Sequence, residues 1–236
     1  MMTDSPQKNR VLAEKLIRLL DPSYRQRWEI YDGILKRLTV PGTRWLDGGC
    51  GRNEAIGEFP CDITVGLDTY RHPEAFHRAP THLVLGTMER LPFRDGAFTL
   101  VTLNTVAEHF ENPRAACGEI RRVLGPGGHL LVHTTNRLSP LIMAGKLLPE
   151  SLRLRLMKAG FGARDRDVFS THHRLNTRAA FRTLDGFDTV EFYAVQDLNW
   201  SNRMVFFCLL AFHLLTKLPG LWRLRTNLVV LLKKKG

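Results

Sequence analysis

The sequence predicts an α/β fold built around a mostly parallel β-sheet. Strand and helix signals alternate from residue 44 to residue 135, which is the pattern of successive strand–helix–strand units. A glycine-rich turn directly follows the first short apolar strand, and the second strand ends in Asp68, 21 residues after Asp47 (68 − 47). Ligands of open parallel sheets bind at the carboxyl ends of the strands, where such turns lie.

The leading elements are two helices, expected over 7–20 and 24–38, in which apolar residues recur at helical spacing. We interpret them as covering the sheet or capping a cleft, in preference to contacting a substrate directly. Pro41-Gly42 ends this region, and the strands 44–48 and 63–68 follow.

The next elements complete the core of the predicted sheet. Residues 83–104 indicate a strand, a turn that contains Leu-Pro-Phe and Asp-Gly, and another strand. A helix is expected from about Pro113 to Leu124, because proline suits a first helical turn and Gly125 is a typical helix stop. The strand 129–135 follows that stop.

The glycine turn predicts a site for a nucleoside cofactor without phosphates. A carboxylate such as Asp68, about 20 residues beyond the first strand, is placed to accept both ribose hydroxyls. A dinucleotide motif requires a third glycine where this chain has Glu54, whose charge would repel a pyrophosphate. The positive sulfonium and amino groups of S-adenosylmethionine tolerate that carboxylate. No Gly-Lys-Ser/Thr sequence follows the turn, which excludes a P-loop.

In this order the segments resemble the class I S-adenosylmethionine-dependent methyltransferases, in particular the branch that acts on small molecules and lipids. The resemblance covers roughly residues 40–200 and rests on LDGGCG, VGLD, MERLPFRDGAFTLV, NTVAEHFENP, EIRRVLGPGGHLLVHTTN and RTLDGFDTVEF. It implies a Rossmann-like sheet whose last strand is antiparallel, and S-adenosylmethionine as the cofactor.

The resemblance also implies the cofactor-binding residues, which are Asp47, Gly48, Gly49, Gly51, Asp68, Thr87, Met88, Glu89 and Asn104. Three positions depart from the family's pattern. Asn53 replaces a small residue after the turn, and Thr87 replaces the acid that often begins the adenine-contacting loop. Thr99 replaces the usual aspartate of Phe-Asp-Leu-Val, and we expect its role to be structural. Met88 is expected to offer an apolar face to the adenine.

Three histidines are candidate catalytic residues. Methyl transfer to an oxygen needs alignment of the nucleophile and benefits from a base that takes its proton. His109 follows the fourth strand, where the family's Glu-His pair lies against the cofactor, and packing or hydrogen bonding there is an equally good interpretation. His172 and His173 are placed to reach an acceptor hydroxyl, and His133 is a weaker candidate. No cluster has metal-ligand spacing, so no metal is predicted.

We expect a single methyltransferase domain over 1–236. Its parts are N-terminal helices (1–40), a cofactor-binding core (41–137), a helical lid that binds substrate (138–182), and C-terminal strands (183–236) with an apolar helical insertion at about 203–225. The four cysteines lack metal or disulfide spacing, and the N-terminus lacks the pattern of a signal peptide. Both features favour a cytoplasmic location.

The net charge of +11 is concentrated in two segments. Residues 42–140 contain 10 Lys/Arg and 11 Asp/Glu, whereas 141–182 contain 9 and 3, and 203–236 contain 7 and none. Such local excess predicts an anionic partner: a membrane surface, a phosphorylated substrate or RNA.

The apolar run 204–215 bears on that choice. Its 12 residues are too few for the roughly 20 that a spanning helix needs. The helix could be buried against the sheet, or it could lie in a bilayer interface with Trp222 and flanking cations at the headgroups. We favour the second interpretation, which places the protein peripherally at the inner face of a membrane.

The predicted function is transfer of a methyl group from S-adenosylmethionine to a hydroxyl, in preference to carbon or nitrogen, of a small-molecule, lipid or glycan-linked acceptor. One alternative is an RNA methyltransferase, but a nucleic-acid partner is disfavoured because no RNA-binding module is recognisable. Another is a catalytically degenerate, membrane-associated binding or scaffold protein, which Asn53 and Thr87 suggest.

Overall fold

The computed structural model describes residues 6–51, 59–71, 82–147, 171–199 and 202–236. The predicted departure at Asn53, the Glu54 carboxylate and the lid residues 148–170 lie outside the described residues. By their internal contacts the residues form two compact units. One comprises 1–29, 136–170 and 194–227, and the other comprises 30–135, 171–193 and 228–236.

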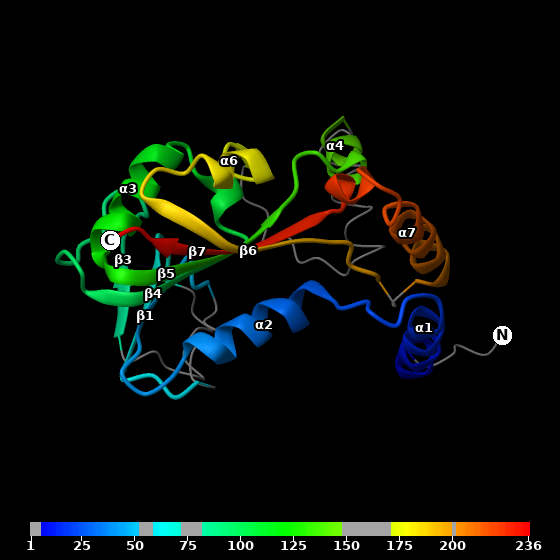
Figure 1. The fold of residues 1–236 in the computed structure, drawn as a ribbon, viewed down its shortest axis with the longest axis horizontal. Helices are drawn as coiled ribbons and strands as arrows, with labels where there is room; N and C mark the ends of the chain where they lie inside the picture. Colours follow the sequence, from blue (N-terminus) through cyan, green and yellow to red (C-terminus); the bar gives the residue numbers. More distant parts are fainter. Residues whose placement is uncertain (1–5, 52–58, 72–81, 148–170, 200–201) are drawn as a thin grey trace. The chain divides into compact units, whose positions relative to one another are not determined.

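A seven-stranded sheet forms the centre of the second unit, in the order β3-β2-β1-β4-β5-β7-β6. The strands are β1 (Arg44–Gly48), β2 (Ile63–Asp68), β3 (His82–Leu85), β4 (Phe98–Asn104), β5 (Leu124–Thr135), β6 (Phe187–Val195) and β7 (Asn227–Lys234). The pairs β1–β2, β1–β4, β2–β3 and β4–β5 are parallel, whereas β7 runs antiparallel to its neighbours (Figure 1). The predicted Rossmann-like sheet with an antiparallel last strand is therefore confirmed.

Helices cover both faces of this sheet. In Figure 1, α2 (Arg27–Leu38) lies below the sheet, and α3 (Pro113–Val123) and α6 (Arg178–Arg182) lie above it. The side chain of Asn112 caps α3 by accepting a hydrogen bond of 3.2 Å from the Ala115 N–H, and Pro113 occupies the first helical position. The second predicted helix begins at residue 27 instead of 24.

The predicted end of α3 is correct to within one residue, but the predicted start of the next strand at 129 is wrong. The helix ends at Val123, and Leu124 already has the extended backbone of β5 while its N–H closes the last turn on the Ile120 carbonyl. The strand begins five residues earlier than expected because its first residues pair with the start of β4, before a register shift. Gly127 and not Gly125 takes the left-handed conformation, with φ of 68°.

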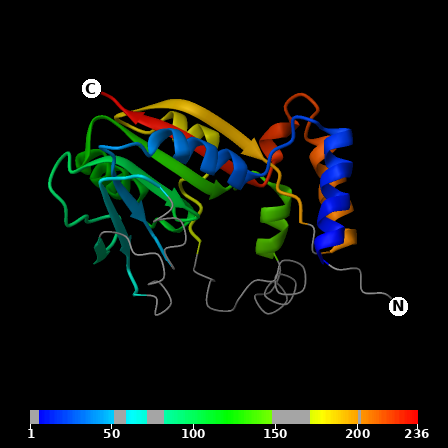
Figure 2. The same cartoon turned by 90° about the horizontal axis from the view of Figure 1, so that it is seen from below.

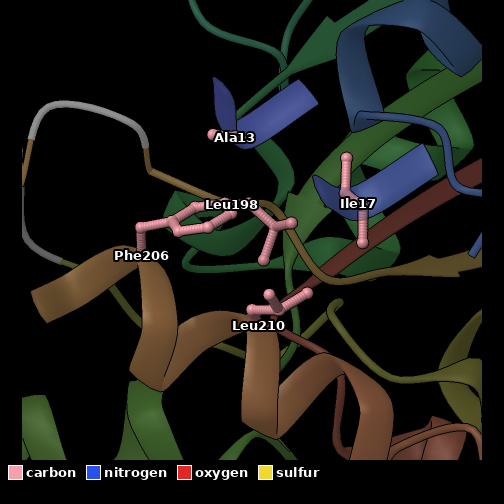
Figure 3. Close-up of a cluster of buried hydrophobic side chains, with 5 residues drawn as sticks. All are labelled: Ala13, Ile17, Leu198, Phe206 and Leu210. Carbon is pink, nitrogen blue, oxygen red and sulfur yellow. The ribbon is translucent and has the colours of Figure 1, made fainter. Parts of the chain in front are cut away.

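The other unit contains α1 (Pro6–Leu20), α4 (Pro140–Leu147), α7 (Arg203–Leu215) and the 3-10 turn η3 (Leu221–Leu224). Figure 2 shows α1 and α7 side by side. Their shared core consists of the buried side chains of Ala13, Ile17, Leu198, Phe206 and Leu210 (Figure 3). No helix among the described residues is long and apolar enough to cross a membrane.

Candidate cofactor and acceptor site

The turn after β1 brings the chain close to its neighbours at the carboxyl edge of the sheet. Gly49 has φ of 67°, and a Cβ added there would lie 2.4 Å from a methyl carbon of Val106. A Cβ on Gly48 would lie 2.6 Å from the Met88 sulfur. Gly51 also has a left-handed backbone, but no atom of the described residues lies within 4 Å of its Cβ position. Gly48 and Gly49 therefore allow close packing of the turn against Met88 and Val106.

The backbone N–H groups of this turn are already used. Those of Gly49 and Cys50 donate to the Leu67 carbonyl at 2.7 and 3.1 Å. That of Gly51 donates to the Asp68 carboxylate at 2.8 Å. A glycine turn that cradles phosphate needs free N–H groups directed at the ligand. The described turn offers none, in agreement with the prediction of a cofactor without phosphates.

Two carboxylates end adjacent strands at this edge. Asp47 is 7% exposed and accepts a hydrogen bond of 2.6 Å from the Thr102 hydroxyl, which in turn accepts one of 2.7 Å from the Trp45 indole. Burial and the charge of Asp68 raise the pKa of Asp47 to about 6, against the lowering effect of Thr102. Asp68 itself is half-buried. The pair makes this edge favourable for a cationic ligand.

The loop after β3 is anchored from α3. The Leu91 N–H donates to the Glu119 carboxylate at 2.8 Å, and the Arg122 guanidinium donates to the carbonyls of Leu91 and Phe93 at 2.9 and 2.6 Å. These bonds hold the predicted cofactor loop beside the turn. Within it, Met88 is buried against Gly48, whereas Thr87 is exposed and Glu89 is half-buried.

At the end of β4 the structure adds a polar pair. Asn104 is exposed, and its side-chain oxygen lies 2.7 Å from Nδ1 of the buried His133 on β5. The bond requires a proton on Nδ1, since the amide oxygen only accepts. His133 thus serves to orient Asn104 at the cofactor edge. The expected structural role of Thr99 is confirmed, because its hydroxyl accepts a 3.0 Å bond from the Arg44 N–H.

The three candidate catalytic histidines converge on one short turn. His109 ends the 3-10 turn η1 (Ala107–His109), and the preceding Glu108 carbonyl accepts the backbone N–H groups of both His172 and His173, at 2.8 and 2.9 Å. The Glu108 carboxylate is buried and accepts a 2.8 Å bond from Thr134 on β5. One residue therefore joins the end of the predicted lid to the end of the sheet.

The two lid histidines have different surroundings. His172 is partly exposed, with Nε2 3.6 Å from the Glu111 carboxylate. His173 is buried, has φ of 53°, and places Nδ1 2.5 Å from the side-chain nitrogen of Asn176. A left-handed backbone in a non-glycine residue is often found at functional sites. The side chains that orient these groups, Thr102, Thr134 and Asn176, were not among the predicted site residues.

The cysteine at the site does not act as a nucleophile. Cys50 lies in the glycine turn, but burial raises the pKa of its thiol to about 12, so it is a packing residue. Among the described residues, no group of three or more His, Cys, Asp or Glu side chains could hold a metal ion.

Comparison with known proteins agrees with this geometry. Residues 46–132 match the family model described as a methyltransferase domain. The fold and this match together identify the segment as a class I S-adenosylmethionine-dependent methyltransferase domain.

Individual relatives share 28–32% identity with this chain, over part of its length. The chain is 28% identical to a ubiquinone biosynthesis O-methyltransferase of Xanthomonas campestris over 143 residues, 55% of this chain and 58% of that one. It is 32% identical to the malonyl-[acyl-carrier protein] O-methyltransferase of Serratia marcescens over 103 residues, 40% and 39% of the two chains. The match therefore spans only about half the length of these relatives. An S-adenosylmethionine dependent methyltransferase of Mesorhizobium loti shares the fold, with a TM-score of 0.55, 17% identity, and coverage of 88% of this chain and 97% of that one.

Proposed function

We propose that this protein transfers a methyl group from S-adenosylmethionine to a hydroxyl oxygen of a small-molecule or lipid-like acceptor. The observation that carries the proposal is the charge arrangement at the glycine turn. Its described N–H groups donate to acceptors within the protein, and two carboxylates, Asp47 and Asp68, lie at the carboxyl ends of β1 and β2. Such an edge favours a cationic nucleoside over a nucleotide phosphate. The fold alone would not decide the chemistry.

In this proposal the cofactor supplies an electrophilic methyl group on a sulfonium. Asp68 accepts the ribose hydroxyls, and the ionised Asp47 stabilises the positively charged end of the cofactor. Gly48 and Gly49 allow the ligand to approach the backbone, and Met88, Thr87, Glu89 and Asn104 line the remaining edge. The cofactor-binding set is thus proposed as the sequence predicted it.

Of His172 and His173, the base for the acceptor hydroxyl would be His172, because the Asn176 amide donates to Nδ1 of His173 and so leaves the proton of that ring on Nε2. Their backbone bonds to Glu108 hold them beside His109, and no metal is needed for a displacement in which the protein aligns the nucleophile and removes its proton. An oxygen acceptor agrees with the two relatives named as O-methyltransferases. The basic excess of residues 141–182 includes Arg164, Arg166, Arg174 and Arg178, which would bind a phosphate on a lipid-linked acceptor or an RNA backbone. Arg174 and Arg178 are described, whereas Arg164 and Arg166 are outside the described residues.

The proposal is tested by two measurements. Calorimetric titration should detect S-adenosylmethionine and S-adenosylhomocysteine, and Asp68→Asn should weaken both; absence of binding by the wild-type protein would favour a scaffold role. Label from methyl-labelled cofactor should enter a lipid or small-molecule extract. Label found mainly in RNA, and lost in Arg174→Gln, would reverse the choice of acceptor.

The role of the histidines needs a separate comparison. His172→Gln and His173→Gln should leave the cofactor Kd unchanged. The substitution that lowers kcat and also removes the acidic limb of the pH profile identifies the histidine that acts as the base. His109→Gln should instead change the cofactor Kd. Equal and pH-independent losses in all three variants would contradict general-base catalysis.

A further inference from the structure

The exposed face of α7 is an apolar surface without a charge. Met204, Cys208, Ala211 and Leu215 recur at the spacing i, i+4, i+7 and i+11, which places them on one side of the helix, and all four are exposed. Met204 is 74% exposed and Phe207 51%. The opposite side is buried in the core shared with α1. The helix therefore has two apolar sides, only one of which the described structure covers.

The neighbouring helix α1 extends this surface. Leu12 and Leu19 are seven residues apart on one side of α1 and are 61% and 79% exposed. The two helices run parallel. Ala13 and Phe206 share one core cluster (Figure 3), and Asp21, just beyond the end of α1, bonds His213 near the end of α7 at 2.9 Å. With this direction and these buried faces, helical geometry turns Leu12, Leu19 and Phe207 toward the same side of the pair.

Cations outnumber acidic residues around this apolar surface, where the half-buried Glu14 is the acidic residue of the α1 segment 12–19. No Asp or Glu occurs between residues 198 and 236. Arg203 begins α7, and Arg223 stacks on the Trp222 ring with 5.5 Å between the guanidinium carbon and the ring centroid. On α1, Lys15 is exposed between the two leucines. Lys217 is paired with Asp21 at 3.0 Å and contributes less.

We propose that the α1–α7 face, defined as Leu12, Leu19, Met204, Phe207 and Leu215 with the surrounding Lys15, Arg203 and Arg223, docks on an anionic lipid bilayer. Exposed apolar side chains within a basic rim fit the headgroup–acyl boundary of such a membrane, and a tryptophan beside an arginine is typical of that depth. A 13-residue helix can lie in the interface but cannot span the bilayer. This proposal does not depend on the methyl acceptor.

The first experiment is sedimentation of the full chain with phosphatidylcholine vesicles, with and without phosphatidylglycerol. Binding should require the anionic lipid and weaken at high salt. Arg203→Gln and Arg223→Gln should each reduce the partition coefficient about five-fold. Phe207→Asp should reduce it about ten-fold or more, because the exposed ring is replaced by a charge. Val190→Asp is the matched control, since both parent residues are 51% exposed.

The second experiment needs no change to the face itself. An environment-sensitive fluorophore on Cys208, the exposed cysteine, in a Cys61→Ser background should shift to the blue when anionic vesicles are added. Failure of the wild-type chain to bind any vesicle, an unshifted fluorophore, or equal losses in Phe207→Asp and Val190→Asp would overturn the proposal. So would a dimer in sedimentation velocity that Phe207→Asp dissociates, because a second copy would then cover the face.

Discussion

The buried carboxylate of Asp47 makes cofactor affinity depend on pH. Burial and the charge of Asp68 raise its pKa to about 6, so the free protein holds a growing fraction of neutral Asp47 as the pH falls below that value. If only the form with ionised Asp47 binds the cationic cofactor, the apparent affinity is proportional to the fraction of Asp47 that is ionised. That fraction is about one in eleven at pH 5 and about ten in eleven at pH 7. We therefore expect Kd to rise roughly ten-fold from pH 7 to pH 5.

The assay is calorimetric titration of S-adenosylhomocysteine at pH 5, 6 and 7, a range in which an α-amino group stays protonated. Binding near pH 6 should also release up to about half a proton, which appears as a dependence of the heat on buffer ionisation enthalpy. Asp47→Asn should bind weakly and without this pH dependence. Asp68→Asn should lower the midpoint, because the repelling charge is gone.

The raised pKa of Asp47 also makes the free energy of unfolding depend on pH, with the neutral carboxyl favoured in the folded state. The stabilisation from this group is complete below the unfolded pKa of 3.8 and is lost as the pH rises through about 6. Asp47→Asn should therefore stabilise the free protein at pH 7, by about 1–3 kcal/mol. An unchanged Kd between pH 5 and 7 in folded wild-type protein, or the same pH dependence in Asp47→Asn, would refute this reasoning.

Four further substitutions test the site and the helix pair. Gly49→Ala should cost more stability and affinity than Gly51→Ala in denaturant and ligand titrations, because both have φ above 50° but only the first would clash; equal losses would contradict this. Thr102→Val should move the midpoint of cofactor binding to higher pH and cost about 1–3 kcal/mol, since it also strands the tryptophan N–H. Asp21→Asn should cost about 3 kcal/mol in thermal unfolding at neutral pH by leaving buried donors unpaired. Burial lowers the pKa of His213, so wild-type stability should fall as the pH drops below 6.5, and a rise there would contradict this sign.

The parts of the fold that sequence predicted are those encoded locally. Short segments of five to seven residues, in which most side chains are buried, define β1, β2 and β4, and each ends in a glycine or a polar residue that marks the edge of the sheet. The position of the cofactor site could also be predicted, because the carboxyl ends of parallel strands lie at the same edge of the sheet. The start of β5 was missed because Gly125-Pro-Gly-Gly128 is typical of a turn, whereas in the structure it forms the irregularity between Leu124 and His129, both of which pair with β4.

The parts that sequence did not predict depend on contacts between distant residues. Thr102 lies 55 positions from Asp47 in the sequence, and it is a buried residue of a mostly apolar strand. Nothing in the local sequence indicates that its hydroxyl bonds the Asp47 carboxylate. The bonds from His172 and His173 to Glu108 use backbone groups, which every residue type has. No side-chain pattern can report such bonds, although the paired histidines themselves were visible.

Charge is separated along this chain in a way that distinguishes its two proposed partners. Residues 42–140 are nearly neutral, so attraction of a cationic cofactor must come from Asp47 and Asp68 at short range, where salt screens little. The attraction of residues 203–236 to an anionic surface involves exposed, separated cations and is screened strongly. Raising the ionic strength should therefore release the protein from anionic vesicles while changing the cofactor Kd much less. An equal salt dependence of the two affinities would contradict this assignment of cofactor binding to short-range contacts and of membrane binding to exposed cations.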